Sequence, residues 1–215
     1  MKDLVDLMSF RADFYRLLSS LFLQEVSLDL LKNLSSLKKI SLPVETGDAE
    51  GLIPPRGRNL DEIKEELDVD FARIFLGLGP QPAFPYESIY RSRSGLLMQE
   101  PFDEVRDIYR MAGVKKIPDL KEPEDHIAVE LAFMADLCSR AGMAFKDNRS
   151  EEALIQLEIQ KEFLQNHLSS WIPSLCADIE RVAQTGFYKS LAALLRSWII
   201  SEGQELDNRI GDLKK

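Results

Sequence analysis

Cysteine and histidine are both scarce in this chain of 215 residues, which has two of each. The cysteines, Cys138 and Cys176, lie far apart and show no Cys-x-x-Cys spacing. That excludes a zinc knuckle and the disulfide framework of a small secreted domain. Both cysteines instead fall within apolar stripes at helical spacing, so we expect them to be small core residues.

Excess basic charge and long apolar runs are missing as well. Lys and Arg number 27 against 36 Asp and Glu, which gives a formal net charge of -9. Sequence-independent nucleic-acid binding needs a basic surface, so we expect no nucleic-acid partner. No stretch approaches the roughly 20 apolar residues of a membrane span, and residues 1–6 carry acids where a signal peptide has a basic start. These absences predict a cytoplasmic protein with no membrane insertion.

Apolar residues at helical spacing fill most of the sequence. A first stripe contains Phe10, Phe14, Leu17, Leu18, Leu21 and Phe22, with Arg11 placed off it. Period-two alternation is absent over any useful length. We therefore predict an all-α fold, a single helical domain over residues 1–215 with about eight helices. The helices are expected at about 10–22, 28–40, 59–75, 102–112, 123–138, 150–169, 172–185 and 187–202.

Two connectors interrupt the helical pattern. The segment 77–101 holds four of the ten prolines and three glycines among apolar and aromatic residues. A loop of this length inside a compact domain is unusual and tends to be functional. The second connector, 114–122, could serve as a hinge for domain swapping. Pro123 then suits the first turn of the next helix, where Glu124 and Asp125 complement the helix dipole.

No catalytic constellation can be assembled from these residues. The run Gly77–Pro80 lacks the later glycine and the Lys-Ser/Thr pair of a phosphate-binding loop. Neither histidine has a glutamate three residues before it, as a helical di-iron site requires. Ser88, Asp125 and His126 could form a triad on paper, but no nucleophile elbow surrounds the serine. We therefore expect no enzyme, no metal and no cofactor.

His126 admits two interpretations. It could hydrogen-bond locally and fix the helix start, or make a pH-sensitive contact to a ligand at the helix mouth. The apolar residues of 77–101 likewise either fold onto the helices or line a groove for an extended peptide. For His167 a helix-face or partly buried position is expected, and for Trp171 and Trp198 a core position.

Several sequence elements carry a family resemblance. They are Asp70–Gly77 with Gly79-Pro80, Pro85–Tyr90 with Leu97–Pro101, Glu122–Ile127 with Glu130, Leu131, Phe133 and Met134, and the later Phe163-Leu164, His167-Leu168, Trp171, Pro173 and Phe187-Tyr188. Together they resemble the TorD/DmsD family of redox-enzyme maturation chaperones. The Glu-Pro-x-Asp-His element is the most specific part. The resemblance covers nearly the whole chain, although the first fifty residues match only in helical character.

The resemblance implies a TorD-like helical bundle that works as a cytoplasmic chaperone. Such a chaperone would bind the twin-arginine signal peptide and the apo-form of a molybdopterin oxidoreductase catalytic subunit during cofactor insertion, before export. Family members are monomers or domain-swapped dimers, so either state is compatible. The alternatives are a NarJ-like assembly chaperone of a non-exported molybdoenzyme, a GTP-binding helical protein, and a plain helical interaction module.

Carried over position by position, the resemblance assigns signal-peptide contacts to seven residues, Tyr86, Ser88, Tyr90, Glu122, Pro123, Asp125 and His126. Tyr86 stands where the family has a tryptophan. Arginine favours planar carboxylate partners, so Glu122 and Asp125 are the expected acceptors, with Glu87 and Glu100 as further candidates. The apolar part of the peptide would lie in a trough lined by Phe84, Tyr86, Tyr90, Leu96 and Leu97. This hypothesis requires that the loop and the helix start meet in space.

Overall fold

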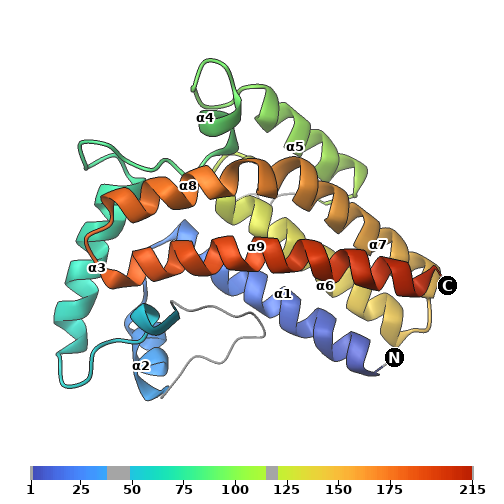
Figure 1. The fold of residues 1–215 in the computed structure, drawn as a ribbon, viewed down its shortest axis with the longest axis horizontal. Coiled ribbons are helices and arrows are strands. Elements are labelled where there is room, and N and C mark those ends of the chain that lie inside the picture. The colour runs from blue at the N-terminus through green and yellow to red at the C-terminus, as the bar shows by residue number, and fades with distance from the viewer. Residues whose placement is uncertain (1, 38–48, 115–120, 215) are drawn as a thin grey trace. The chain divides into compact units, whose positions relative to one another are not determined.

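The structure is a computed structural model that describes residues 2–37, 49–114 and 121–214. Over these residues it is helical and contains no β-strand, so the all-α prediction is confirmed (Figure 1). The α-helices are α1 (Lys2–Leu23), α2 (Leu28–Ser36), α3 (Leu60–Phe75), α4 (Glu87–Arg91), α5 (Glu100–Met111), α6 (Ile127–Lys146), α7 (Ser150–Phe163), α8 (Ser169–Val182) and α9 (Gly186–Leu213). A 3₁₀ turn, η1 (Ala49–Leu52), and a π turn, η2 (Leu164–Leu168), complete the described elements.

The described residues group into two compact units, each assembled from separate stretches of the chain. Unit 1 consists of Met1–Leu23, Tyr86–Trp171 and Ser201–Lys215, and unit 2 of Gln24–Pro85 and Ile172–Ile200. Two of the boundaries, after Trp171 and after Ile200, fall inside α8 and α9, so each of these helices contributes residues to both units. The single domain expected over residues 1–215 stays a prediction.

Unit 1 is organised around α6, which contacts both α1 and α7. This helix is apolar on nearly all sides, and such helices are buried because no face of them prefers water. The rings of Tyr109 on α5 and Phe133 on α6 lie 4.5 Å apart between centroids, and Phe133 lies 4.9 Å from Phe163 on α7. Cys138 is buried on the same helix, as expected.

Unit 2 is organised around α3. Its residues Phe71 and Phe75 contact the ring of Tyr188 on α9, at centroid distances of 6.2 and 5.9 Å. Cys176 and Trp198 are buried core residues of this unit, as expected. The apolar face of α3 therefore forms part of the core of unit 2, as its periodicity predicts.

Several of the predicted helix boundaries are wrong, among them the start expected at residue 10, since α1 begins at Lys2, and the end expected at residue 138, since α6 continues to Lys146. The helix expected from Pro123 begins at Ile127, because His126 caps it. The break expected near residue 170 is absent, because the π turn η2 joins α7 to α8, and Pro173 lies inside α8. A π turn widens the helix locally and is a common way to accommodate an irregularity without ending it. The last helix continues past residue 202 to Leu213.

The segment 77–101 is less irregular than expected. The short helix α4 forms within it, which gives nine α-helices in the described ranges against the eight predicted. The helix expected at 28–40 ends at Ser36. Its last residues, 38–40, and most of the expected hinge, 115–120, lie outside the described residues.

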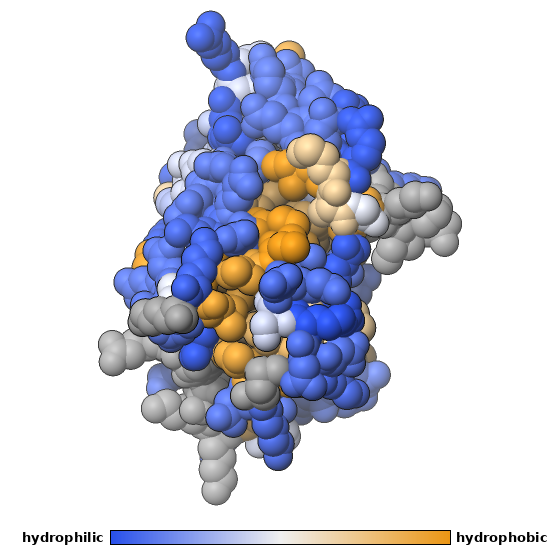
Figure 2. Space-filling view, turned by 90° about the vertical axis from the view of Figure 1, so that its right-hand side faces the viewer, coloured by the Kyte–Doolittle hydropathy of each residue, from blue (hydrophilic) through white to orange (hydrophobic). Residues whose placement is uncertain are grey.

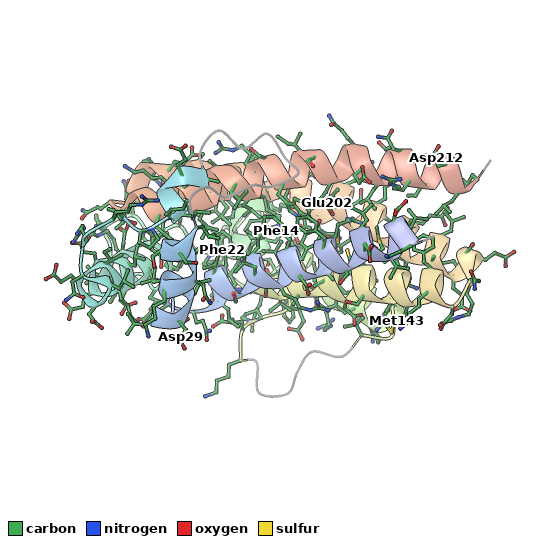
Figure 3. All side chains as sticks on the ribbon, turned by 90° about the horizontal axis from the view of Figure 1, so that it is seen from below. Phe14, Phe22, Asp29, Met143, Glu202 and Asp212 are labelled. Atoms are coloured by element: carbon green, nitrogen blue, oxygen red, sulfur yellow. The ribbon has the colours of Figure 1, made fainter. Side chains whose placement is uncertain are left out.

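Arg11, which the sequence places off the apolar stripe, is nevertheless buried. Its side chain is 1% exposed, and its Nη2 donates to Oε2 of Glu202 at 2.6 Å while Nε donates to Oε1 at 2.9 Å. Figure 3 shows Glu202 on the side of α9 that faces α1. Helical periodicity could not indicate this burial, because the partner that neutralises Arg11 lies 191 residues away.

Candidate functional site

The hypothesis requires two segments to meet, the aromatic loop within residues 77–101 and the acidic helix start at residues 122–126. Residues of both segments lie in contact within unit 1. Tyr86 and His126 form an isolated antiparallel bridge, and the backbone N–H of Glu87 donates to the carbonyl of Asp125 at 2.9 Å. The Tyr86 hydroxyl donates to Oε2 of Glu122 at 2.7 Å. The Tyr86 ring packs edge-on against the His126 ring, with centroids 5.0 Å apart.

Ser88 and Asp125 form the buried floor of this contact. Asp125 Oδ2 accepts a hydrogen bond from the backbone N–H of Ser88 at 3.0 Å, and Ser88 Oγ accepts one from the backbone N–H of Gln99 at 3.1 Å. Burial raises the pKa of the Asp125 carboxyl. The Oδ1 atom of Asp125 is buried and has no hydrogen-bond partner among the described residues. Both side chains are therefore inaccessible to solvent and support the surface residues of the site through these hydrogen bonds.

His126 acts as the N-cap of α6, which is the structural interpretation of this residue. Its Nδ1 accepts a hydrogen bond from the backbone N–H of Ala128 at 3.0 Å. Burial lowers the pKa of His126 to about 4, so its ring is neutral at neutral pH. A neutral ring is required here, because a doubly protonated imidazole has no acceptor nitrogen. The ring still faces Tyr86, so it supports the surface of the site.

The other predicted contacts reach the surface. Tyr86, Tyr90, Glu122 and Pro123 are all partly exposed, in contrast to Ser88, Asp125 and His126. The Tyr90 ring stacks on Trp171, with centroids 5.6 Å apart. A peptide could therefore touch the first four residues directly, whereas the buried three would act by positioning them.

An exposed apolar loop joins α4 to α5 beside these residues. Leu96, Leu97 and Met98 are 62, 46 and 58% exposed, although they are large apolar side chains. The loop is fixed at its end by the hydrogen bond from Gln99 to Ser88. Of the predicted trough residues, Tyr86, Tyr90, Leu96 and Leu97 belong to unit 1, and Phe84 belongs to unit 2.

A buried ionic cluster lies directly behind the surface residues, and the sequence did not predict it. Glu87 is fully buried, and its carboxylate accepts hydrogen bonds from Nη1 of Arg91 at 2.5 Å and from Nδ1 of His167 at 3.0 Å. The same Arg91 nitrogen is 3.3 Å from Oε2 of Glu104. The four-residue spacing of Glu87 and Arg91 on a helix could have indicated this pair. No sequence signal links either residue to His167, which is buried as well.

Glu130 extends the cluster inward from α6. Its Oε2 accepts a hydrogen bond from Nε1 of the buried Trp171 at 3.2 Å. Its other carboxyl oxygen, Oε1, is buried and has no hydrogen-bond partner among the described residues. Burial and the nearby charge of Glu87 raise the pKa of Glu130 well above its ordinary value.

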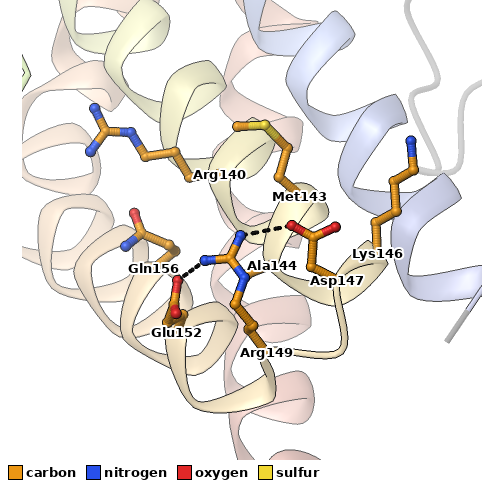
Figure 4. Close-up of a pocket in the computed structure, with 8 residues that line it drawn as sticks. All are labelled: Arg140, Met143, Ala144, Lys146, Asp147, Arg149, Glu152 and Gln156. Atoms are coloured by element: carbon orange, nitrogen blue, oxygen red, sulfur yellow. Dashed lines mark hydrogen bonds and ion pairs between the residues drawn. The ribbon is translucent and has the colours of Figure 1, made fainter.

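A cavity of about 460 Å³ lies elsewhere in unit 1, at the turn between α6 and α7 (Figure 4). Arg149 lies in it between Asp147, whose Oδ2 is 2.9 Å from Nη2, and Glu152. Both acids are more than half exposed. Arg149 thus resembles Arg91 in contacting two carboxylates, but neither of its partners is buried.

Apolar side chains are also exposed between α5 and α7. A depression of about 160 Å³ is lined in part by Ile108, Met111 and Ile159, and Met111 is 79% exposed. Figure 2 shows apolar residues gathered in a strip across the face that lies to the right in Figure 1. Apolar surface of this kind commonly marks a site of interaction with another protein.

Comparison with known proteins gives consistent matches. A family model described as the nitrate reductase delta subunit matches residues 49–177. A protein named chaperone protein TorD from Vibrio parahaemolyticus is 34% identical over 86% of this chain and 89% of its own length. Proteins of the same name from Vibrio atlanticus and Vibrio cholerae are 30% and 29% identical, over 96% and 98% of this chain and 99% and 98% of their own lengths. None of the helices in the described ranges is both long and apolar enough for a bilayer crossing.

Proposed function

Because the chain belongs to the family of the nitrate reductase delta subunit and the TorD chaperones, we propose that it is a maturation chaperone for a redox enzyme. Its relatives are named chaperones, which gives the chain a chaperone's role rather than an enzyme's. The proposed client is the catalytic subunit of a molybdopterin oxidoreductase, bound in its apo-form through its twin-arginine signal peptide. The chaperone would act in the cytoplasm. It would hold the subunit until the cofactor has been inserted, and export would follow.

One observation carries the peptide-binding part of this proposal, namely the contact between the aromatic loop and the acidic helix start. It brings the partly exposed Tyr86 against the carboxylate of Glu122. The partly exposed ring of Tyr90 follows four residues later, and all three residues belong to unit 1. A twin-arginine peptide offers two guanidinium groups followed by an apolar run. The guanidinium groups favour carboxylates, and the apolar run suits the exposed Leu96–Met98 loop.

Calorimetric titration with synthetic signal peptides tests the proposal. The probes are the twin-arginine peptides of the molybdoenzymes encoded in the same genome, each paired with a twin-lysine version. We expect binding that weakens about tenfold or more with lysine, because an ammonium group cannot make bidentate contacts to a carboxylate. If none of the twin-arginine peptides binds the chain, the proposal fails.

Two variants locate the binding surface. Tyr86→Ala and Glu122→Gln should each weaken binding of the twin-arginine peptide by a factor of about five to thirty. This is the factor that corresponds to losing one good contact of about 1–2 kcal/mol. Glu152→Gln is the matched control, because it removes one exposed carboxylate from unit 1 at the cavity of Figure 4. Equal effects of Glu122→Gln and Glu152→Gln would show only a loss of net negative charge.

A second candidate function follows from the description of the matching family model. A nitrate reductase delta subunit match over residues 49–177 also suits a NarJ-like assembly chaperone, whose client is not exported. Such a chaperone would bind the apo-enzyme after deletion of the signal sequence. Co-purification with a truncated client therefore separates the two functions, since persistent binding favours the assembly role.

A further inference from the structure

We infer that the Glu87 carboxylate is the acceptor for one arginine side chain of the partner peptide, and that Arg91 occupies this acceptor while the chain is free. The inference rests on the proposed function, because it names the group that would select arginine at that site. It assigns a role to two residues that the family resemblance does not: Glu87 as the receiving carboxylate and Arg91 as an internal competitor.

The geometry around Arg91 is that of a guanidinium site. Arg91 is 29% exposed and reaches inward to the fully buried Glu87, 2.5 Å away. The same nitrogen lies 3.3 Å from Glu104, which is 51% exposed. The guanidinium group therefore lies between one buried and one exposed carboxylate, with an open path to solvent on the Glu104 side. An arginine from a peptide could approach along that path.

Acidic groups outnumber the donors in this cluster. Glu87, Asp125 and Glu130 are all fully buried, while Arg91 and His167 are the basic side chains that contact Glu87. In addition, the buried Oδ1 of Asp125 has no partner within the part of the chain that the structure describes. A buried carboxylate without a cation is unfavourable, so a guanidinium group is expected beside Glu87 in most molecules.

Exchange of one guanidinium group for another meets this requirement. The incoming group would fill the volume that Arg91 leaves, and Glu87 would stay paired before and after the exchange. Arg91 is the last residue of α4, a helix of five residues, so its side chain can turn outward without disturbing a following helical turn. It could then remain near Glu104, which is exposed.

The surroundings suit the rest of the peptide. The exposed Leu96–Met98 loop follows α4 directly, and Tyr90, next to Arg91, stacks on Trp171. An arginine bound at Glu87 would thus place the adjoining apolar run beside apolar side chains of unit 1. The site would therefore recognise an arginine followed by apolar residues.

The first experiment titrates Arg91→Gln with the twin-arginine and twin-lysine peptides. Because a competitor that fills the site about nine-tenths of the time lowers apparent affinity about tenfold, we expect a gain of that order for the twin-arginine peptide. The gain for the twin-lysine peptide should be much smaller. Arg149→Gln is the control, since it removes the same charge from a pair of exposed acids. Arg91→Lys keeps a positive charge beside Glu87, so its gain in affinity for the twin-arginine peptide should be intermediate.

The second experiment needs no signal peptide. Arg91→Ala removes the guanidinium group, and its unfolding temperature is measured with methylguanidinium or methylammonium chloride at low millimolar concentration. A ligand that binds the folded state raises the unfolding temperature, so methylguanidinium should stabilise Arg91→Ala more than methylammonium does. Arg149→Ala should show no such difference between the two salts.

The two experiments fail separately. If the wild-type chain binds no twin-arginine peptide but methylguanidinium stabilises Arg91→Ala, the proposed function is wrong and the guanidinium site stands. If the wild-type chain binds the peptide and Arg91→Gln binds it no better than Arg149→Gln does, the inference is overturned and the proposed function stands. An equal response of Arg91→Ala to both salts also overturns the inference.

Discussion

His126 shows how a residue in a family motif can serve the fold and the site together. Its Nδ1 caps α6 and its ring supports Tyr86, which is one of the exposed contact candidates. The cap depends on an unprotonated ring, and burial keeps the ring unprotonated down to a pKa of about 4. In the unfolded chain the same imidazole takes up a proton near pH 6.5.

This difference predicts a pH dependence of stability. The pKa of His126 is lower in the folded state, so the unfolded state binds more protons and stability falls as pH drops from about 6.5 to about 4. In His126→Asn an amide oxygen can cap the helix at any pH. The variant therefore lacks the pH-dependent contribution of the imidazole to stability. Urea unfolding of both proteins across this range should show that the free energy of unfolding of the wild type falls by up to about 3 kcal/mol more than that of His126→Asn. Parallel stability curves would contradict the assignment.

The residue types of the candidate site could be predicted from the sequence, but their burial could not. Tyr86, Tyr90 and Glu122 are partly exposed as a binding role requires, whereas Asp125 accepts a hydrogen bond from Ser88 inside the unit. The ionic cluster was missed because Glu87 and His167 are 80 residues apart, and no local pattern records such a pair. Their approach depends on how α4 and the π turn η2 are placed in unit 1.

At the scale of elements, the family-like run that begins at Asp70 has a structural explanation. Asp70 lies on α3 and is buried, and its carboxylate accepts hydrogen bonds from the backbone N–H groups of Gln184 and Thr185 at 3.0 and 2.8 Å, and from the Thr185 hydroxyl at 2.7 Å. These donors form the turn between α8 and α9. The carboxylate therefore satisfies N–H groups just before a helix, where they have no helical partner.

Removal of this carboxylate should destabilise unit 2. Asp70→Ala leaves several donors without their acceptor, so we expect a loss of about 2–4 kcal/mol, given about 1.5–3 kcal/mol for a hydrogen bond to a charged group and incomplete additivity. Thr185→Val removes only the hydroxyl bond and should cost about 1 kcal/mol. Urea unfolding measures both, with the exposed Glu65→Ala on the same helix as the control. An effect of Asp70→Ala no larger than that of Glu65→Ala would contradict this explanation.

Helix type was more predictable than helix ends. Periodicity identified most of the elements because each helix buries an apolar face, and burial selects residues at that spacing. The ends depend on contacts that periodicity does not record. His126 starts α6 through one side-chain hydrogen bond, and Pro173 does not end α8. Glycine at position 203 likewise fails to stop α9, on the turn where Glu202 pairs with Arg11.

At the scale of the whole chain, that ion pair joins its first and last helices. Arg11 on α1 and Glu202 on α9 are both buried, and both belong to unit 1. A buried ion pair is weak evidence for stability, because desolvation opposes the attraction between the charges. Loss of one partner is different, since the remaining charge is then buried alone. The pair can therefore fix the position of residues 201–213 on α1 without adding much net stability.

A double-mutant cycle separates these two effects. Arg11→Met and Glu202→Leu should each lower the free energy of unfolding by about 3–5 kcal/mol, because each leaves one buried charge unpaired. The double variant Arg11→Met/Glu202→Leu should recover most of that loss, since no buried charge remains and the apolar side chains refill the volume. Urea unfolding gives the coupling energy, and losses that simply add would show that the residues act independently. Because neither residue belongs to the candidate site, the folded double variant should bind the twin-arginine peptide within about twofold of the wild type, as expected for distant, uncoupled positions.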